Sequence, residues 1–261
     1  MALSDEQLER YARHIVLREV GGPGQAKLLA ARVLVIGAGG LGSPLVLYLA
    51  AAGIGTIGIV DFDAVSLSNL QRQIAHASSS IGEAKTRSAA RAIRALNPDV
   101  RVVEHNCRIG AENAVALIQQ YDIVADGSDN PGTRFLVNDA CWFAERVLVS
   151  AAVTEFDGQI ATYKAFKRGR GFPCYRCLFR EPPPHGSSAS CSESGILGAA
   201  AGVMGTLQAL EVMKEILGIG ESLAGQLLIY DALATRFRKV KVPADPACAL
   251  CGPNRRIISL A

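Results

Sequence analysis

The segment Val33-Leu34-Val35-Ile36-Gly37-Ala38-Gly39-Gly40-Leu41-Gly42 decides the fold that we predict for this 261-residue chain. An apolar, β-branched run enters a G-x-G-x-x-G loop and is followed by an Ala- and Leu-rich run, which predicts a strand, a tight loop and a helix. Glycines let the backbone approach a phosphate closely, and the first turn of a helix offers unpaired N–H groups to an anion. We therefore expect a phosphate-binding loop at Gly37, Gly39 and Gly42.

A second strand is predicted over Thr56–Val60. It ends at Asp61, about 20 residues beyond the glycine loop, where a carboxylate can accept hydrogen bonds from the hydroxyls of a ribose. A G-x-G-x-x-G motif alone is a weak signal, because glycines also serve simple turns. The strand, the helix and the acid around it strengthen the prediction of a nucleotide site, which either a dinucleotide or ATP would suit.

The segment 61–73 is dense in polar groups suited to phosphate and to Mg²⁺-bound water. In an open α/β sheet, ligands bind at the carboxyl ends of the strands, which is where this segment begins. Asn69 and Arg72 lie within it, and Lys85 follows at the start of the next predicted helix, 83–96. Each of them alone is a surface residue by default, but behind a phosphate loop they suit a triphosphate better than a pyrophosphate bridge.

The length and net charge of the chain limit the classes of protein to which it can belong. The chain is long enough for one large α/β domain, and its net charge of +3 gives no general basic field, so nucleic-acid binding is a minor hypothesis. Glycines and Pro44 interrupt the uncharged run Val33–Val60, so we expect buried elements of a parallel sheet and no membrane partner. The first ten residues have no apolar signal-peptide core, which indicates a cytoplasmic protein with reduced cysteines.

Strand-like and helix-like segments alternate as far as Ala152, and the rhythm then changes to antiparallel strand patterns. We predict a Rossmann-like, doubly wound α/β fold whose mostly parallel sheet is extended by antiparallel strands. The chain 1–261 is expected to form a single domain. Its parts are an N-terminal helical arm (1–30), a nucleotide-binding βα core (31–152), and an antiparallel extension with a crossover loop and a zinc site (153–261).

Two charged residues leave alternatives open. Asp129, just past the fourth predicted strand, would either hold Mg²⁺ or cap the helix that begins near Pro131. Arg13 follows Arg10 on a helix that Ser4 would cap. By helix spacing alone, both arginines are solvated surface charges.

Two C-x-x-C pairs predict a structural zinc site. Cys174 with Cys177 and Cys248 with Cys251 offer four thiolates, which complete a tetrahedral Zn²⁺ shell with no open position. The alternatives are two redox dithiols or plain thiols. A closed site stabilises the fold without taking part in the chemistry.

With these parts assembled, the chain resembles the ThiF/MoeB/HesA family of adenylyltransferases, relatives of the ubiquitin-activating enzymes, over nearly its whole length. Members of this family use ATP and Mg²⁺ to adenylate the C-terminal glycine of a ubiquitin-like sulfur carrier, releasing pyrophosphate. The matching segments are Arg10–Arg13, Gly37–Gly42, Asp61–Asp63, Ser68–Gln73, Lys85, Ser128–Asn130, Cys174–Cys177, Gly205–Glu211 and Cys248–Cys251.

The resemblance implies roles for the matched residues. Arg72, Lys85 and Asp129 would be catalytic, with Asp129 organising Mg²⁺, and Arg13 would reach the phosphates of the partner subunit in a homodimer. The carrier carboxylate, with a pKa of about 3.5, needs no general base, and we assign no role to the four histidines. The implied ATP-binding set is Gly37, Gly39, Gly40, Gly42, Asp61, Asp63, Ser68, Asn69, Leu70, Gln71, Arg72, Gln73, Lys85, Asp129 and Asn130.

Cys191 has no cysteine left to pair with. It lies in a Pro- and Ser-rich stretch just ahead of a predicted helix, whose N-terminus would lower the pKa of the thiol, so we consider it a candidate reactive residue. It also matches the loop cysteine that links covalently to the carrier in ThiF-like members. Ser194 departs from the usual Cys-x-x-Ala-Gly pattern there.

The expected partners are a sulfur carrier ending in Gly-Gly, a second copy of the chain, and a separate sulfur donor. The donor would be a sulfurtransferase or a cysteine desulfurase, because no rhodanese-like domain follows Cys251. Segments 61–69 and 156–160 look MoeB-like, and 202–211 looks ThiF-like. We therefore prefer a carrier of the molybdopterin pathway and keep a carrier of the thiamine pathway as the alternative.

Two other functions compete with adenylation. An NAD-dependent oxidoreductase would explain the first strand-loop-helix unit but would leave Arg72, Lys85 and Asp129 unused. A non-catalytic nucleotide-sensing or tRNA-binding relative is the other alternative, and the modest net charge argues against RNA.

Overall fold

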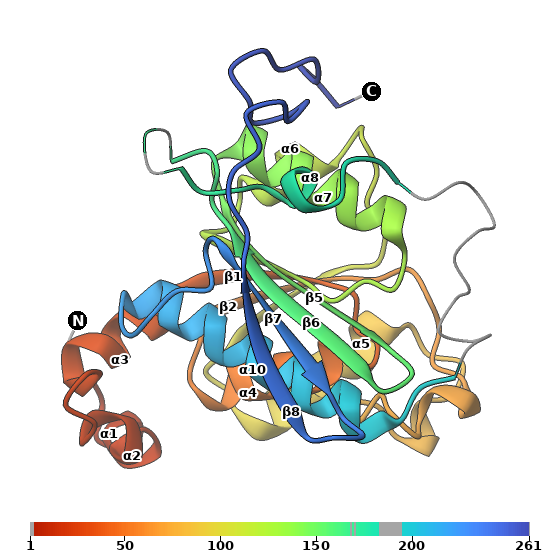
Figure 1. Cartoon of the computed structure of the whole chain (residues 1–261). Coiled ribbons are helices and arrows are strands. Elements are labelled where there is room, and N and C mark those ends of the chain that lie inside the picture. The colour runs from red at the N-terminus through yellow and green to blue at the C-terminus, as the bar shows by residue number, and fades with distance from the viewer. Residues whose placement is uncertain (1–2, 168, 170, 183–194, 261) are drawn as a thin grey trace.

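The computed structural model describes residues 3–167, 169, 171–182 and 195–260 of the chain. Its N-terminal arm consists of three helices, α1 (Asp5–Arg10), α2 (Ala12–Ile15) and α3 (Gly21–Ala30) (Figure 1). The first begins at a capping box: the Ser4 hydroxyl accepts a hydrogen bond from the Gln7 N–H at 3.2 Å, and the Gln7 side chain accepts one from the Ser4 N–H at 3.3 Å. Two donors at the start of the helix are thereby satisfied.

Eight strands form one sheet in the order β3-β2-β1-β4-β5-β6-β7-β8. The first five in this order run parallel, and β6, β7 and β8 are antiparallel to their neighbours, which confirms the predicted mixed sheet. The chain reverses its direction of strand addition between β1 and β4, which is where doubly wound sheets bind ligands. The strands are β1 Arg32–Ile36, β2 Thr56–Val60, β3 Arg101–His105, β4 Ile123–Asp126, β5 Val147–Thr154, β6 Asp157–Tyr163, β7 Gln226–Asp231 and β8 Arg236–Lys241.

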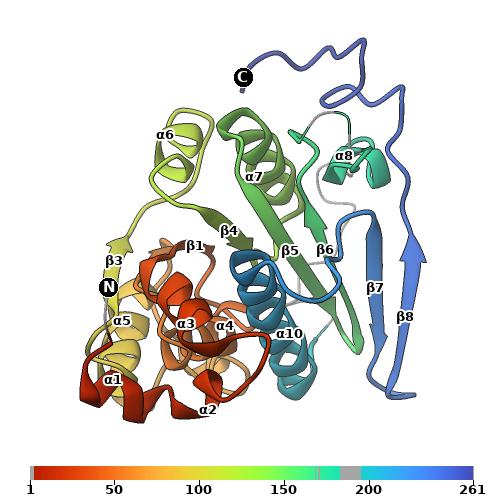
Figure 2. The same cartoon turned by 90° about the vertical axis from the view of Figure 1, so that its left-hand side faces the viewer.

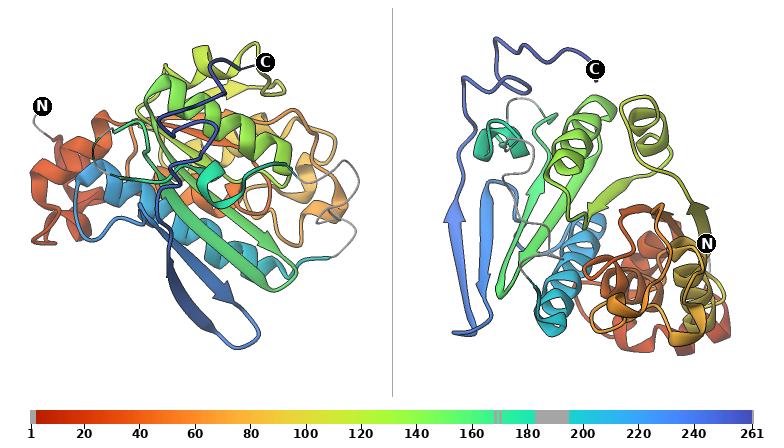
Figure 3. Two further views of the ribbon diagram at one scale, coloured as in Figure 1. Left: turned by 45° about the horizontal axis from the view of Figure 1, so that its top comes forward. Right: turned by 90° about the vertical axis from the view of Figure 1, so that its right-hand side faces the viewer.

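Helices cover both faces of the sheet and bury two apolar clusters against it (Figures 1 and 2). Helices α4, α5 and α10 pack on one face, and α6 and α7 pack on the other. Figure 3 shows the β7–β8 hairpin at one edge of the molecule and the N-terminal arm at the opposite edge. These helices are α4 Gly42–Ala51, α5 Lys85–Leu96, α6 Ala114–Ile118, α7 Pro131–Ala144, α8 Tyr175–Leu178 and α10 Gly198–Leu217, and two short 3₁₀ turns are η1 Leu67–Asn69 and η2 Ser78–Ser80.

Helix α10 packs closely against the glycine loop because it presents glycines there. A Cβ atom at Gly205 would collide with the carbonyl oxygen of Leu41, and one at Gly198 would collide with the carbonyl oxygen of Gln71. Gly202 has no neighbour within 4 Å of such an atom, so not every glycine of α10 serves close packing. Among the described residues, no helix combines the length and the apolar character that a membrane span requires.

Candidate nucleotide site and cysteine cluster

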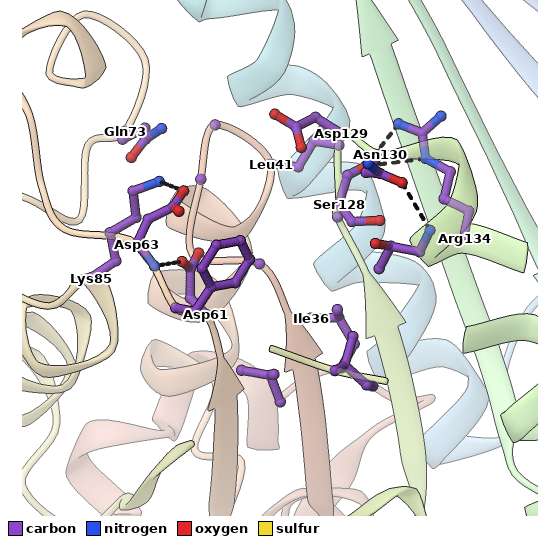
Figure 4. A pocket seen from close by; sticks show the side chains of 18 of the residues that line it. Ile36, Leu41, Asp61, Asp63, Gln73, Lys85, Ser128, Asp129, Asn130 and Arg134 are labelled. Atoms are coloured by element: carbon purple, nitrogen blue, oxygen red, sulfur yellow. Dashed lines mark hydrogen bonds and ion pairs between the residues drawn. The ribbon is translucent and has the colours of Figure 1, made fainter. Parts of the chain in front are cut away.

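A cavity of about 410 Å³ opens at the carboxyl ends of β1, β2 and β4 (Figure 4). Its walls come from the glycine loop, the segment after β2, the start of α5, the segment after β3 and the loop between β4 and α7. A cavity at this switch point is where the sheet topology places a ligand. The residues of the expected ATP-binding set that line it are Gly37, Gly39, Gly40, Asp61, Asp63, Arg72, Gln73, Lys85, Asp129 and Asn130.

The other members of that set are not among the residues that line the cavity. Gly42 starts α4, and a Cβ atom there would collide with the Gly37 carbonyl oxygen, so the residue is needed for the tight loop. The Asn69 side chain accepts a hydrogen bond from the Ser66 N–H at 3.2 Å, and the Ser68 carbonyl accepts one from Arg72 Nη1 at 3.1 Å. These contacts shape the segment that carries Arg72. Leu70 and Gln71 follow η1 and contribute no side chain to the lining.

Asp61 binds the backbone of the glycine loop and of its own segment. Its Oδ2 accepts a hydrogen bond from the Ala38 N–H at 2.8 Å, and its Oδ1 accepts one from the Asp63 N–H at 2.9 Å. The carboxylate therefore holds the loop after β1 against the end of β2. Each oxygen keeps a second lone pair, which a ribose hydroxyl in the cavity can use.

Lys85 supplies a buried positive charge at the start of α5. Its side chain is 7% exposed, and Nζ donates to Asp63 Oδ2 at 2.7 Å (Figure 4). The ammonium group has two further protons for other acceptors. Since the side chain of Asp63 is half exposed, the pair forms a partly solvated wall of the cavity that can exchange contacts with a phosphate.

Two buried polar atoms at the cavity have no protein partner. Gln73 Oε1 and Ser128 Oγ are both shielded from solvent, and neither makes a hydrogen bond within the described part of the chain. Both residues line the cavity. Burying a polar group without a hydrogen-bond partner is energetically unfavourable, so these atoms are suited to bond a polar ligand, or water in its place.

Asp129 points into the cavity from the wall opposite Lys85 (Figure 4). The neighbouring residue Asn130 caps α7, because its Oδ1 accepts a hydrogen bond from the Thr133 N–H at 3.1 Å. The capping alternative for Asp129 is therefore wrong. Arg134 fixes this loop by donating from Nε and Nη2 to the Ser128 carbonyl at 3.1 and 2.7 Å.

Asp126 supports the same loop from below. Its carboxylate is fully buried and accepts hydrogen bonds from the Ser128 N–H at 3.0 Å and from Ser150 Oγ at 3.3 Å. Burial raises the pKa of Asp126, and the charge of Arg134 opposes that shift. Asp126 is the last residue of β4, and no sequence motif predicted this supporting role.

The donor set of the cavity fits Mg²⁺ held together with a polyphosphate. Magnesium is usually bound by one or two carboxylates, by water and by substrate phosphates. Among the described residues, no cluster of three or more potential ligands lies at the cavity, and Asp129 is the carboxylate on the wall facing Lys85. An ion bound here would depend on the nucleotide for its other ligands.

Arg13 lies far from this cavity in the same chain. The arm that carries it packs against the C-terminal end of α5: Arg10 Nη1 donates to the Leu96 carbonyl at 3.1 Å, and the Asn97 side chain donates to the Tyr11 hydroxyl at 2.9 Å. Lys85 begins that helix, which has 12 residues. At 1.5 Å per residue, the two ends are about 18 Å apart. Cys191, the other residue for which we expected chemistry, lies outside the described residues.

The four predicted zinc ligands come together in one cluster. The Sγ atoms of Cys174, Cys177, Cys248 and Cys251 all lie within 4.8 Å of one another. Hydrogen bonding with Cys174 lowers the pKa of Cys177 to about 7 and also lowers that of Cys248, whereas hydrogen bonding with Cys177 raises the pKa of Cys174. Four thiolates at this separation match the ligand set of structural Zn²⁺, and the ion would neutralise their charge.

Buried polar contacts join this cluster to α7. The Tyr175 N–H donates to Asn138 Oδ1 at 2.8 Å. Arg176 forms a two-pronged ion pair with Asp139, with Nε–Oδ1 and Nη2–Oδ2 distances of 2.8 and 2.7 Å. Helix α7 starts beside Asp129, so the cysteine cluster and the cavity share one element. These contacts join residues 37 apart in the sequence, and no local pattern announces them.

The sequence also missed a stacked pair at the rim of the cavity. The Arg108 guanidinium lies 4.2 Å from the centre of the Phe62 ring, and both residues line the cavity. Phe62 is half exposed, as a side chain at an open rim would be. In the sequence, the acids Asp61 and Asp63 on either side of Phe62 indicated a binding segment, and the aromatic ring did not.

Comparison with known proteins then decides the family. The sequence profile of the ThiF family matches residues 11–250. The chain belongs to the ThiF family. A sulfur carrier protein adenylyltransferase of Thermus thermophilus is 47% identical over 259 residues, which cover 98% of this chain and 96% of that protein. The family resemblance inferred from the motifs is thereby confirmed.

Longer relatives match the same region. The adenylyltransferase and sulfurtransferase MOCS3 of Bos taurus is 48% identical over 260 residues, 99% of this chain but 56% of that protein, so the chain spans about half the length of this relative. A crystal structure of E. coli MccB with ATP superposes with a TM-score of 0.80 at 23% identity, covering 93% of this chain and 73% of that one. This likeness supports the fold.

Proposed function

We propose that the chain is an ATP-dependent adenylyltransferase that activates the C-terminal glycine of a ubiquitin-like sulfur carrier. The observation that carries the proposal is the cavity itself. It combines a phosphate loop, the buried Lys85, Arg72 and the free carboxylate of Asp129 in a ThiF-family fold. The positive charges of Lys85 and Arg72, together with the carboxylate of Asp129, suit a nucleotide triphosphate with its metal better than a dinucleotide such as NAD.

The residues of the cavity would bind the parts of ATP separately. The glycine loop, Lys85 and Arg72 provide donors for the phosphates, and Asp61 accepts from the ribose. The orphaned oxygens at Gln73 and Ser128 accept hydrogen bonds from the ligand or from water that it carries. The nucleotide is thereby fixed along the carboxyl edge of the sheet, with its α-phosphorus open to an incoming carboxylate.

The reaction needs alignment and charge neutralisation, and it needs no proton transfer. The carrier's terminal carboxylate is ionised at neutral pH, so it attacks the α-phosphorus directly. One P–O bond to the carboxylate forms while the bond to the bridging α,β-oxygen breaks, and pyrophosphate leaves with its electron pair. Arg72 and Lys85 stabilise the negative charge that builds up on the phosphates.

Metal ions are proposed for both sites. Mg²⁺ bound by Asp129 and the phosphates would neutralise the charge of the leaving pyrophosphate. Zn²⁺ in the four-cysteine cluster would be structural, since all four positions of its shell are taken by Cys174, Cys177, Cys248 and Cys251.

We further propose that the active unit is a homodimer in which Arg13 reaches the phosphates in the cavity of the partner subunit. The support is its position: Arg13 lies on the arm at the far end of α5 from Lys85 in its own chain. Exposed apolar side chains on the same arm, Val16 at 76% and Leu17 at 49%, would be covered by a second copy.

Mixing two inactive variants tests this arrangement. Arg13→Ala and Asp129→Ala should each be inactive, and a mixture of the two should regain about a quarter of the wild-type activity, because half of the dimers are mixed and each contains one intact site. A mixture that stays inactive, although native mass spectrometry shows mixed dimers, would contradict the shared site.

The carrier and the sulfur donor are proposed on family grounds. The match to MOCS3 relatives supports a carrier of the molybdopterin pathway, with a thiamine-pathway carrier as the alternative. The donor would be a sulfurtransferase or a cysteine desulfurase. Cys191 would be the residue to examine for a covalent bond to the carrier.

Intact-mass analysis of the carrier tests the proposed chemistry. With ATP, Mg²⁺ and the chain, a carrier ending in Gly-Gly should gain the mass of one adenylyl group, and a carrier lacking its last glycine should gain none. Tight NADH binding without any adenylylated carrier would instead support an oxidoreductase.

A further inference from the structure

His76 lies between the glycine loop and the helix that carries Lys85. The residue is 8% exposed and belongs to the segment between η1 and η2. Its Nε2 is 3.0 Å from the carbonyl oxygen of Ala38 in the glycine loop, and its Nδ1 is 3.0 Å from the hydroxyl oxygen of Ser88 on α5. One imidazole ring thus joins the glycine loop to α5, and residues of both elements line the cavity.

The partners determine the tautomer of the ring. A carbonyl oxygen can only accept, so Nε2 carries the proton and donates it to Ala38. Nδ1 then accepts a hydrogen bond from the Ser88 hydroxyl. Burial lowers the pKa of His76, which keeps the ring neutral and preserves this arrangement at neutral pH.

Ala38 is held from both sides. Its N–H donates to Asp61 Oδ2 at 2.8 Å, and its carbonyl accepts from His76. In a trans peptide the carbonyl of one residue and the N–H of the next point in opposite directions. The Ala38–Gly39 bond is trans, so a carbonyl turned toward His76 turns the Gly39 N–H away from it.

The Gly39 N–H is available for a ligand. Gly39 lines the cavity, and no acceptor among the described residues bonds its N–H. The carbonyl of Gly39 is engaged, because it accepts from the Ser43 N–H at 2.9 Å in the first turn of α4. The peptide between Ala38 and Gly39 is therefore the one whose orientation His76 controls.

We propose that His76 is a positioning residue for the nucleotide: by binding the Ala38 carbonyl, it aims the Gly39 N–H at a phosphate of ATP. The inference rests on the proposed function only in taking ATP as the ligand. Ser43 Oγ also donates to the Ala38 carbonyl, at the longer distance of 3.5 Å. Without the ring, this weaker contact alone holds the carbonyl, and the Gly39 N–H is less firmly directed at the anion. The contact with Ser88 keeps the loop in register with α5 and Lys85.

Two matched variants separate the donor from the rest of the ring. His76→Gln places an amide N–H close to the position of Nε2 and can still donate to Ala38. His76→Asn is shorter: it can reach Ser88 but not Ala38. We expect His76→Asn to weaken ATP binding about tenfold, the value of one hydrogen bond to a charged ligand, and His76→Gln to remain close to the wild type. Ser88→Ala removes the hydrogen bond to Nδ1 but leaves the ring in place, so it should weaken ATP binding less than His76→Asn does.

Calorimetric titration with ATP and with adenosine, beside a thermal melt of each variant, measures this effect. A positioning role predicts weaker ATP binding with unchanged adenosine binding, because adenosine has no phosphate to meet the Gly39 N–H. Equal losses for both ligands, or equal losses in the Gln and Asn variants, would overturn the inference. If the Asn variant does not fold, an ATP-selective loss in Ser88→Ala supports the inference and unchanged binding overturns it. Absence of ATP binding by the wild type would overturn the proposed function itself.

Discussion

Asp61 uses both oxygens of its carboxylate to fix backbone, which the sequence did not predict. The spacing from the glycine loop predicted a ribose acceptor, whereas the structure shows hydrogen bonds from the N–H groups of Ala38 and Asp63. Loop geometry and nucleotide binding therefore depend on the same side chain. A substitution here would alter both together, so Asp61 is a poor choice for a selective test.

Asp129 is the better choice, because it is exposed at the cavity and forms no ion pair with another described residue. We predict that Asp129→Ala lowers the rate of adenylation by about 10²–10³-fold, the usual loss when one group that stabilises transition-state charge is removed. The melting temperature should stay at the wild-type value. Near-normal turnover of a well-folded variant would show that Asp129 does not hold the metal.

His76 also predicts a pH dependence of stability. Burial lowers its pKa in the folded state, while the unfolded chain takes up a proton near pH 6.5. Lys85 opposes protonation, and Asp61 and Glu83 favour it, but burial is the largest effect. The stabilising contribution is thus present above about pH 6.5 and is lost as the pH falls below it, by at most about 1.4 kcal/mol per pH unit. Urea titrations at about pH 7.5 and 5.5 should show a smaller loss for His76→Gln than for the wild type.

The position of a single residue could be predicted only where a local sequence pattern indicates it. Asp61 directly follows a predicted strand and Lys85 lies at the start of a predicted helix, so their place at the cavity could be inferred. His76 could not, because its partner Ala38 lies 38 residues away and one histidine in a polar loop looks like any other. Arg134 and Asp126 were missed for a different reason: both hydrogen-bond the nearby backbone of Ser128, and no sequence motif predicts such contacts.

The sequence predicts that helix α10 exists but not where it ends. The uncharged run Gly195–Leu210 in the sequence predicts a helix that ends at residue 210, but the helix continues to Leu217 and ends before Gly218, which adopts a left-handed conformation (φ 71°). The charged residues in its second half are not surface residues. Glu211 is 2% exposed and accepts hydrogen bonds from Thr162 Oγ1 at 2.8 Å and from the Leu223 N–H at 2.7 Å. The helix was expected to end before its first charged residue, Glu211, because the partners that bury this side chain are distant in the sequence.

The two kinds of glycine in α10 give a matched test of close packing. Gly205→Ala places a methyl group against the Leu41 carbonyl and should destabilise the fold by about 1–3 kcal/mol, as overpacking does. Gly202→Ala meets no atom and should stabilise the helix by up to about 1 kcal/mol. Chemical denaturation of both variants measures the difference. Equal effects would mean that α10 does not approach the glycine loop as closely as described.

At the scale of the whole molecule, the cysteine cluster joins the middle of the chain to its C-terminal part. Its two pairs, Cys174/Cys177 and Cys248/Cys251, are 74 residues apart, and the first of them rests on α7 through Asn138 and Asp139. The spacing of cysteines made this connection predictable. Its attachment to α7, and hence to the loop that carries Asp129, required the structure.

We predict one zinc ion per chain and its loss in Cys174→Ala. The free energy of metal binding contributes to folding, so this variant should melt about 10 °C lower or more. Cys107→Ser, which changes a cysteine outside the cluster, should keep its zinc. Metal analysis by mass spectrometry and thermal melts measure both quantities. Full zinc content in Cys174→Ala would show that the metal is not bound by these four thiolates.

The proposed adenylation is tested most directly by the exchange of labelled pyrophosphate into ATP by the purified, zinc-loaded protein. The reaction is run without a carrier and with carriers of the molybdopterin and thiamine types, each ending in Gly-Gly. Adenylation of a carrier carboxylate predicts exchange that depends on a carrier, and we expect the molybdopterin type to support it. No exchange with either carrier, from a folded dimer that binds ATP, would contradict the proposed function and would mean that the nucleotide site serves another acceptor.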